Sequence, residues 1–318
     1  MKRDYLGFNG GPRVFTGNAN PALAQAICDY LNTPLGKADV FQFSNENIFV
    51  RIQENIRQRD VFIVQSLSHP VNTSIIEMLI MIDAAKRASA GRITAVLPYY
   101  AYGRTDKKDQ PRVPITARLL ADLITTAGAD RVLTMDLHAA QIQGFFNIPV
   151  DELTALTIHT RYFEEKGLDN LVVVATDIGI SKRARDLAER LNAPLAIMEK
   201  RRVAGEPQTL NVIGEVEGKT ALTFDDEIDT GGSLIAAVHA LKGKGAKDIY
   251  SCATHGVLSN KASERLLGSP IKEIVLMDTI PVPPEKRDGK LTVLSVAPLF
   301  GEAIRRIHLG ESVGALFM

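Results

Sequence analysis

The chain has 318 residues, of which 45% are hydrophobic and 23% charged, and Lys+Arg and Asp+Glu each number 37. A chain of this length and composition is expected to form a globular protein of about two domains. Because the charges balance, no overall field attracts nucleic acid or a membrane, and neither is expected as a partner. An anionic ligand must then be bound by a local arrangement of donors.

In chain order, short runs rich in Val and Ile alternate with longer segments whose apolar residues recur at three-to-four spacing. The short runs predict strands at residues 61–65, 92–97, 131–135, 171–175, 220–224 and 248–253. The longer segments predict helices at residues 73–90, 114–127, 181–191 and 232–244. Such alternation is typical of parallel sheets covered by helices, so we predict the α/β class.

An internal repeat supports this organisation. Residues 62–100 and 221–256 share one order of elements, namely strand, loop, helix, basic turn with glycine, and strand. We therefore predict two similar α/β domains, each a mainly parallel sheet flanked by helices, at residues 1–150 and 151–318. The last ~20 residues are expected to pack back on the first domain.

The cysteines and the N-terminal stretch indicate a compartment. Cys28 and Cys252 lie far apart in apolar segments, which argues against a disulfide framework or a metal cluster and is typical of a reducing environment. The stretch MKRDYLGFNGGPRVF lacks the apolar core of a secretory signal, and no run approaches membrane-spanning length. We expect a cytoplasmic protein.

Polar side chains follow three of the predicted strands. Asp136 and His138 follow one strand, Asp177 another, and Asp225 and Asp226 a third. Open α/β sheets bind ligands at the carboxyl ends of their strands, so these residues suggest one crevice. An aspartate after a strand is also a common turn former or helix N-cap, which is the favoured interpretation for Asp136 alone. A turn does not explain two adjacent carboxylates.

The stretch FDDEIDTGGS joins two features that suit opposite ends of one ligand. Glycines and hydroxyls at the start of a helix favour a phosphate, because backbone N–H groups converge there, although the loop lacks the Lys and spacing of a Walker motif. These residues are Thr230, Gly231, Gly232 and Ser233. The two carboxylates would repel a phosphate but accept hydrogen bonds from vicinal hydroxyls. Ribose 5-phosphate carries both groups.

The same stretch resembles the phosphoribosyl-diphosphate motif of type I phosphoribosyltransferases. Over nearly its whole length the chain resembles one family of that superfamily, the ribose-phosphate pyrophosphokinases, in segments that include VLPYYAYGR, MDLHAAQIQGFFNIPVD, EKRR and LSVAPLFGEAIRRIH. The resemblance implies Mg2+-dependent transfer of the β,γ-diphosphate of ATP to the C1 hydroxyl of ribose 5-phosphate, giving phosphoribosyl diphosphate and AMP. It also implies two phosphoribosyltransferase-like domains and a homo-oligomer, with a dimer as its smallest unit and commonly a hexamer.

The resemblance assigns residues to each function. Ribose 5-phosphate is assigned to Asp225, Asp226, Asp229, Thr230, Gly231, Gly232 and Ser233. The nucleotide is assigned to Phe43, Asn45, Glu46, Asn47, Arg104, Thr105, Asp106 and His138. Mg2+ is assigned to His138 and Asp177, and catalysis to Lys200 and Arg202.

Several of these residues also have structural interpretations. A single histidine such as His138 is by default a buried histidine with satisfied hydrogen bonds, and we interpret His255 as structural. The charged run EKRR is most often a solvated surface. The polar stretch VAGEPQTLN that follows it favours a catalytic lid, in which Lys200 neutralises the transferred group and Arg202 binds phosphate oxygens in a bidentate manner.

Three departures from the family pattern leave questions open. The family usually reads Phe-Ser-Asp-Gly-Glu where this chain has FSNEN, and Arg-Gln where it has Arg104 and Thr105. Donor-nucleotide selectivity therefore stays open. The segment KKDQPRVP differs from the family's usual stretch, so phosphate activation and ADP inhibition stay open as well. An active diphosphokinase, a simple phosphoribosyltransferase and a silent regulatory subunit are the alternatives, and the first is favoured.

Overall fold

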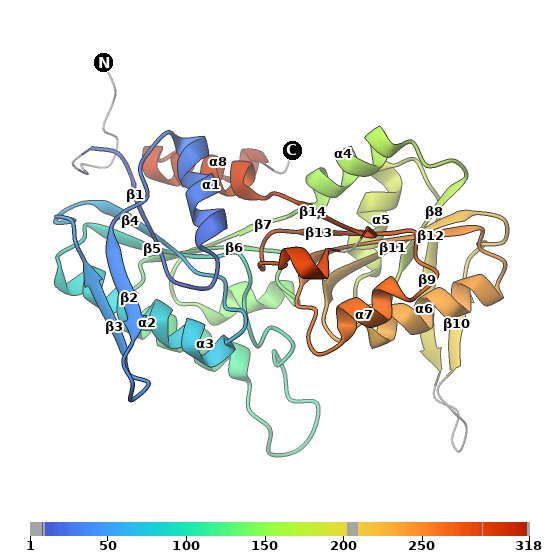
Figure 1. Cartoon of the computed structure of the whole chain (residues 1–318), viewed down its shortest axis with the longest axis horizontal. Coiled ribbons are helices and arrows are strands. Elements are labelled where there is room, and N and C mark those ends of the chain that lie inside the picture. Colours follow the sequence, from blue (N-terminus) through green and yellow to red (C-terminus); the bar gives the residue numbers. More distant parts are fainter. Residues whose placement is uncertain (1–7, 9, 202–208, 288, 317–318) are drawn as a thin grey trace. The chain divides into compact units, whose positions relative to one another are not determined.

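The structure is a computed structural model in which the chain forms two compact units (Figure 1). It describes residues 8, 10–201, 209–287 and 289–316. Unit 1 comprises residues 1–154, 279–281 and 295–318, and unit 2 comprises residues 155–278 and 282–294. None of the helices within the described ranges has the length and apolar character needed to cross a membrane.

Unit 1 contains a parallel five-stranded sheet in the order β1-β4-β5-β6-β7. Its strands are β1 (Arg13–Thr16), β4 (Asp60–Val64), β5 (Arg92–Leu97), β6 (Arg131–Met135) and β7 (Val150–Leu153). Its helices are α1 (Pro21–Leu31), α2 (Val71–Arg87), α3 (Thr116–Ala127) and α8 (Ala297–Leu309), with short 3-10 turns η1 (Ala140–Phe145) and η3 (Gly314–Leu316). A separate antiparallel hairpin consists of β2 (Ala38–Gln42) and β3 (Ile48–Ile52).

Both faces of this sheet are covered. Helices α1 and α8 lie on one face, and α2 and α3 lie on the other (Figure 1). Every residue of β4 is buried, as expected for a central parallel strand whose two faces both pack against helices. This arrangement explains why the predicted strands appear in the sequence as continuous apolar runs.

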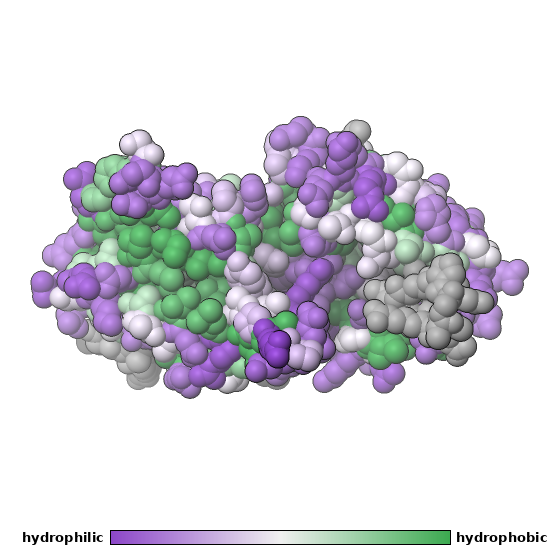
Figure 2. Space-filling model, turned by 90° about the horizontal axis from the view of Figure 1, so that it is seen from below, coloured by the Kyte–Doolittle hydropathy of each residue, from purple (hydrophilic) through white to green (hydrophobic). Residues whose placement is uncertain are grey.

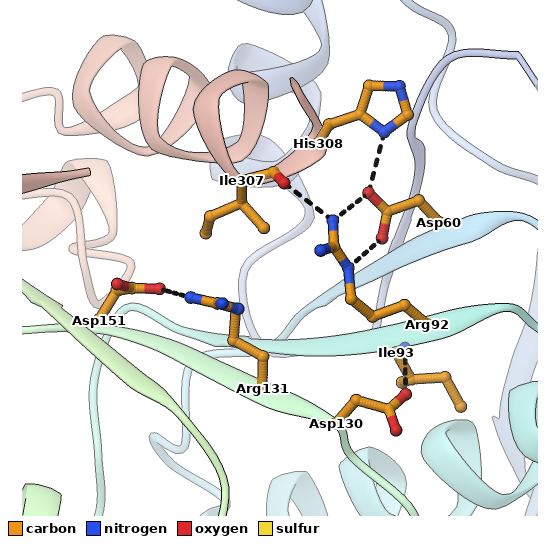
Figure 3. Close-up of polar contacts among 8 residues, drawn as sticks. All are labelled: Asp60, Arg92, Ile93, Asp130, Arg131, Asp151, Ile307 and His308. Carbon is orange, nitrogen blue, oxygen red and sulfur yellow. Dashed lines mark hydrogen bonds and ion pairs between the residues drawn. The ribbon is translucent and has the colours of Figure 1, made fainter. Parts of the chain in front are cut away.

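A buried ion cluster fixes α8 at the amino ends of β4 and β5 (Figure 3). Asp60 has no exposed surface and accepts hydrogen bonds from Arg92, Nε to Oδ1 at 2.8 Å and Nη2 to Oδ2 at 2.6 Å. Arg92 also donates to the carbonyl oxygen of Ile307 at 3.0 Å, and His308 Nδ1 lies 2.9 Å from Asp60 Oδ2. A buried carboxylate needs such partners, so residues distant in sequence are held together here.

Unit 2 contains a seven-stranded sheet in the order β10-β9-β8-β11-β12-β13-β14, which is parallel except for the β9–β10 pair. Its strands are β8 (Leu171–Ala175), β9 (Leu195–Arg201), β10 (Thr209–Ile213), β11 (Thr220–Ile228), β12 (Asp248–Gly256), β13 (Glu273–Met277) and β14 (Leu291–Leu294). Its helices are α4 (Leu156–Lys166), α5 (Ser181–Arg190), α6 (Gly232–Gly243) and α7 (Ala262–Leu267), with the turn η2 (Pro284–Lys286).

The predicted α/β class, with mainly parallel sheets flanked by helices, is confirmed. The strands predicted at residues 92–97, 131–135 and 171–175 are β5, β6 and β8 with the same bounds, and the four predicted helices are α2, α3, α5 and α6. The predicted domain boundary after residue 150 falls inside β7, which belongs to unit 1. Residues 295–318 also group with unit 1.

Two strand ends were predicted too early. Strand β11 continues to Ile228 and β12 to Gly256, because their parallel pairing extends through Glu227 with His255 and Ile228 with Gly256. Asp225 and Asp226 therefore lie within β11 and do not follow it. The strand pairing fixes the directions of these two carboxylates, which a flexible turn would not do.

Candidate functional site

The polar residues predicted to share a crevice divide between the two units. Asp136 and His138 follow β6 in the sheet of unit 1, whereas Asp177 follows β8 in the sheet of unit 2. Asp225 and Asp226 belong to β11, which is the neighbour of β8 in that second sheet. The residues of unit 1 and those of unit 2 are therefore described separately.

In unit 2 the chain passes from β11 into α6 through a glycine turn. Gly231 is the N-cap of α6 and has a left-handed φ of 73°, a conformation that glycine adopts without the penalty of other residues. The first helical hydrogen bond runs from Ile235 N to Gly231 O at 2.9 Å. The amides of the first turn have no acceptor within the helix, and the helix dipole adds positive character, so this turn is suited to an anion.

Residues after β12 hold this turn in place. Ser259 Oγ donates to Asp229 Oδ1 at 2.5 Å, and Arg265 Nη1 donates to the carbonyl oxygen of Thr230 at 3.3 Å. A Cβ atom added to Gly231 would lie 3.1 Å from Cγ of Leu266, a side chain with no exposed surface. The turn is therefore fixed on three sides before any ligand arrives, and Asp229 serves the turn itself.

The two adjacent carboxylates occupy different environments. Asp226 is buried, with 6% of its surface exposed, and Asp225 is partly buried. Thr176 Oγ1 donates to Asp225 Oδ2 at 2.6 Å, and the backbone N–H of Asp226 donates to Asp225 Oδ1 at 2.9 Å. Burial and then the neighbouring Asp226 carboxyl raise the pKa of Asp225 well above its usual value, although these two hydrogen bonds act in the opposite direction.

Asp177 follows β8 and is exposed. Its Oδ1 accepts a hydrogen bond from Ile180 N at 3.0 Å, which closes the turn into α5. The side chain therefore acts as a turn former. Its role as a metal ligand stays a prediction.

In unit 1, His138 lies beside the turn that carries Arg104. A Cβ atom added to Gly103 would lie 3.3 Å from the Cβ of His138, so these two segments approach closely, and the imidazole is on the exposed side. Asp136 is buried with a positive φ of 40°, and its N–H donates to Leu153 O at 3.0 Å. This geometry agrees with the turn interpretation of Asp136.

A carboxylate on β7 anchors the segment that contains His138. Glu152 accepts hydrogen bonds from Leu137 N at 2.9 Å and from Gln143 Nε2 at 2.5 Å. Gln141 Nε2 donates to Asp106 Oδ2 at 2.9 Å, which connects η1 to the segment after Arg104. Asp106 is 8% exposed, so its carboxylate serves this internal hydrogen bond and offers little surface to a ligand.

Both hydrogen-bond donors of Thr105 are used within its own turn. Its Oγ1 and its N–H both donate to the carbonyl oxygen of Tyr102, at 2.8 and 2.9 Å. Tyr102 in turn donates from its hydroxyl to Asn72 Oδ1 at 2.9 Å. Because Gly103 lies against His138 and Asp106 is hydrogen-bonded to Gln141, the Arg104 turn lies beside the segment of His138 within unit 1. The assignment of these residues to a nucleotide stays a prediction.

The hairpin between β2 and β3 presents the remaining predicted nucleotide residues. Phe43 is 49% exposed, and its ring centroid lies 5.1 Å from that of Phe41. Asn45 Oδ1 accepts from Asn47 N at 3.2 Å, so the tip is closed by an asparagine turn. Glu46 is exposed and has a left-handed φ of 67°.

The predicted catalytic residues are only partly within the described ranges. The backbone of Lys200 pairs with Leu210 in the antiparallel β9–β10 ladder, but its side chain is outside the description. Arg202 and residues 203–208 of the predicted lid lie outside the described residues. The last three residues of that lid, Thr209 to Asn211, belong instead to strand β10 and pair with β9.

Sequence reasoning missed four residues of these sites, namely Thr176, Ser259, Arg265 and Glu152. Thr176, Ser259 and Arg265 contact predicted residues from segments distant in sequence, and Glu152 anchors the segment that contains His138, so the fold is needed to reveal them. A signal for Thr176 existed, since a hydroxyl residue directly follows a predicted strand and precedes Asp177.

A cavity of about 430 Å³ in unit 2 lies away from these residues, at the amino ends of β8 and β11. It is lined by Phe163, Glu164, Gly167, Leu168, Asn170, Leu171, Leu191, Asn192, Pro194 and Lys219. No candidate residue of the phosphate turn or of the carboxylate pair takes part in it. The candidate residues of unit 2 therefore lie outside this cavity.

Comparison of the whole chain with known proteins places this protein, with its carboxylate pair beside a helix N-terminus, in the transferase class of enzymes. Residues 12–128 match the N-terminal domain of ribose phosphate pyrophosphokinase, and residues 199–318 match the phosphoribosyl synthetase-associated domain. The chain belongs to the ribose-phosphate pyrophosphokinase family.

Relatives support this membership over the full length. The ribose-phosphate pyrophosphokinase of Caldanaerobacter subterraneus is 57% identical over 96% of this chain and 97% of its own length. That of Corynebacterium ammoniagenes is 51% identical over 100% of both chains. The crystal structure of phosphoribosylpyrophosphate synthetase from Mycobacterium smegmatis has a TM-score of 0.90 and 45% identity, and covers 94% of this chain and 99% of that chain.

Proposed function

We propose that this enzyme transfers the β,γ-diphosphate of ATP to the C1 hydroxyl of ribose 5-phosphate in a reaction that requires Mg2+. The C1 oxygen forms a bond to the β-phosphorus, the bond from that phosphorus to the oxygen of the α-phosphate breaks, and AMP leaves while the hydroxyl proton is released. The observation that carries this proposal is the carboxylate pair of Asp225 and Asp226 next to the glycine turn at Gly231.

Ribose 5-phosphate fits the two halves of that arrangement. The 5-phosphate would accept hydrogen bonds from backbone amides at Thr230, Gly231, Gly232 and Ser233, where the helix dipole favours negative charge. The ribose hydroxyls would donate to the carboxylates of Asp225 and Asp226. Because Asp229 already accepts from Ser259, its contribution is to hold the turn.

For the nucleotide, the hairpin tip and the Arg104 turn supply complementary groups. The exposed ring of Phe43 offers a face for stacking a base. Adenine needs an acceptor for its exocyclic amine and a donor for a ring nitrogen. The exposed carboxylate of Glu46 can be that acceptor, and the amide N–H2 of Asn45 can be that donor, since the Asn45 oxygen is used by the turn. ATP is therefore the expected donor despite the altered FSNEN segment.

The residues present fit Mg2+ as an ion shared with substrate. Among the described residues, no group of three or more His, Cys, Asp and Glu side chains is arranged to hold a metal. Mg2+ typically keeps several waters and is bound through one or two carboxylates plus substrate phosphates. Asp177 of unit 2 would therefore act through its carboxylate, and His138 of unit 1 through a water, each beside substrate oxygens. The ion would polarise the diphosphate.

Lys200 and Arg202 would act on the diphosphate during transfer. Negative charge on the phosphate oxygens is the main electrostatic demand of the reaction, and a cationic side chain brought to it lowers the barrier. Lys200 would supply a point charge, and Arg202 would supply a planar fork.

Homo-oligomerisation is the last part of the proposal. On unit 1, Ile76 of α2 is 47% exposed, and Leu119 and Leu123 of α3 are 55% and 42% exposed. Figure 2 shows apolar side chains gathered on the face of unit 1 where these two helices lie. Exposed apolar surface of this kind is typical of protein–protein contacts, and a second copy of the chain is the expected partner.

The test is release of AMP from ATP in the presence of ribose 5-phosphate and Mg2+, measured against reactions that lack either the sugar phosphate or the metal. Ribose without the 5-phosphate is the matched substrate control, because it keeps the hydroxyls and removes the group that the glycine turn binds. Sugar-dependent AMP formation supports the proposal. Absence of turnover with any nucleoside triphosphate would support the silent-subunit alternative.

A further inference from the structure

Thr176 occupies a defined place beside the carboxylate pair. Strands β8 and β11 are parallel, and their register pairs Ala175 with Phe224. Thr176 follows Ala175 and Asp225 follows Phe224, so these two residues lie side by side. The Thr176 side chain is buried, with 5% of its surface exposed. Nothing in the activity itself requires a hydroxyl at this position.

The contact fixes the plane of the Asp225 carboxylate. Thr176 Oγ1 donates to Oδ2 at 2.6 Å, and the N–H of Asp226 donates to Oδ1 at 2.9 Å, so both oxygens are held from opposite sides. Each carboxylate oxygen has two lone pairs, so one such hydrogen bond does not exhaust its capacity as an acceptor. Because threonine is branched at Cβ, its χ1 is restricted, which limits the directions that its hydroxyl can take.

We propose that Thr176 is a positioning residue for ribose 5-phosphate, acting through Asp225. The inference rests on the proposed function, because it takes the Asp225 carboxylate as an acceptor for the ribose hydroxyls. The hydroxyl of Thr176 holds that carboxylate in its binding orientation before the sugar arrives, so binding does not have to order it.

Replacement by valine tests the hydroxyl alone, since Thr176→Val keeps the branched shape and removes the donor. The apparent KM for ribose 5-phosphate should rise about five- to twentyfold, a fraction of what a hydrogen bond to a charged group contributes, because the contact acts through Asp225. The kcat at saturating sugar and the KM for ATP should stay within about twofold of wild type. Thr176→Ser should restore most of the affinity.

A matched control is Thr223→Val. Thr223 is a buried threonine of β11 whose hydroxyl donates to the carbonyl oxygen of Tyr250 at 3.4 Å. This variant also removes a buried hydroxyl from the same sheet, so it should change thermal stability without changing the KM for ribose 5-phosphate. If Thr176→Val does not fold, Thr176→Ala removes the same donor with less bulk.

The outcomes separate the two proposals. A wild-type enzyme without ribose 5-phosphate-dependent AMP release would overturn the proposed function. An active wild type, with the same KM in the valine and alanine variants as in the wild type, would overturn only the role of Thr176. A fall in kcat with unchanged KM, or an equal KM increase in Thr223→Val, would also overturn it, since either would indicate a general structural effect.

Discussion

Gly231→Ala tests the geometry of the phosphate turn. The loss of unfolding free energy expected for this variant follows from the backbone angle and the neighbouring side chain. The left-handed φ of 73° would cost an alanine about 1–2 kcal/mol relative to glycine. The new Cβ would lie 3.1 Å from Cγ of Leu266, which is buried, so overpacking adds about 1 kcal/mol. The variant should therefore lose about 2–3 kcal/mol of unfolding free energy.

The assay is thermal unfolding of the purified enzyme with Gly232→Ala as the control. A loss of that size corresponds to a Tm decrease of about 4–12 °C for a unit of this size. A Cβ at Gly232 would meet nothing closer than Thr230 Oγ1 at 3.7 Å, so the control should stay within about 0.5 kcal/mol of wild type. Equal Tm values for the two variants would show that the backbone of this turn is not strained in the way described.

Four further predictions concern the sugar, the catalytic loop, the donor and pH. Asp226→Ala should weaken ribose 5-phosphate by about 1.5–3 kcal/mol in steady-state kinetics, and unchanged sugar KM values in both this variant and Asp225→Ala would contradict the carboxylate assignment. Lys200→Ala and Arg202→Ala should lower kcat by orders of magnitude with little change in ATP binding; near-normal turnover of either would remove that residue from catalysis. ATP should exceed GTP and CTP in kcat/KM by between a few-fold and about a hundredfold, and stronger selectivity would show that the altered FSNEN tip is not permissive. The hydrogen bonds and charges of two arginines, partly opposed by burial, lower the pKa of Glu302 to about 2, so its stabilising effect is present above the unfolded value of 4.5 and lost as pH falls toward 2. The Tm difference between wild type and Glu302→Gln should accordingly shrink between pH 5 and pH 2, and a difference independent of pH would contradict the ion-pair explanation.

The central strands and their helices could be predicted because local pattern and burial agree there. Strands β5, β6 and β8 are buried on both faces, and helices α5 and α6 start at the residues where their patterns begin. The edge elements were missed for a physical reason. The hairpin of β2 and β3 is partly exposed, so it lacks the continuous apolar run of a buried strand.

The site was predictable in its residue types but not in its contacts. Adjacent carboxylates and a glycine turn are local features, so Asp225, Asp226 and Gly231 could be assigned from the sequence. The hydroxyl of Thr176 and the carboxylate of Glu152 act across strands, and their partners depend on register. The extension of β11 beyond Phe224 was missed because charged residues usually end a strand, whereas here its pairing with β12 carries them onward.

The discontinuity of unit 1 has a consequence for the order in which the chain folds. During synthesis the ribosome releases the strands of unit 1 first, but α8 is made only after all of unit 2. Until α8 emerges, Asp60 and Arg92 have each other but lack His308 and the carbonyl oxygen of Ile307. We therefore expect the nascent first unit to stay loosely packed while the second folds, and to reach its final stability in a late, post-translational step.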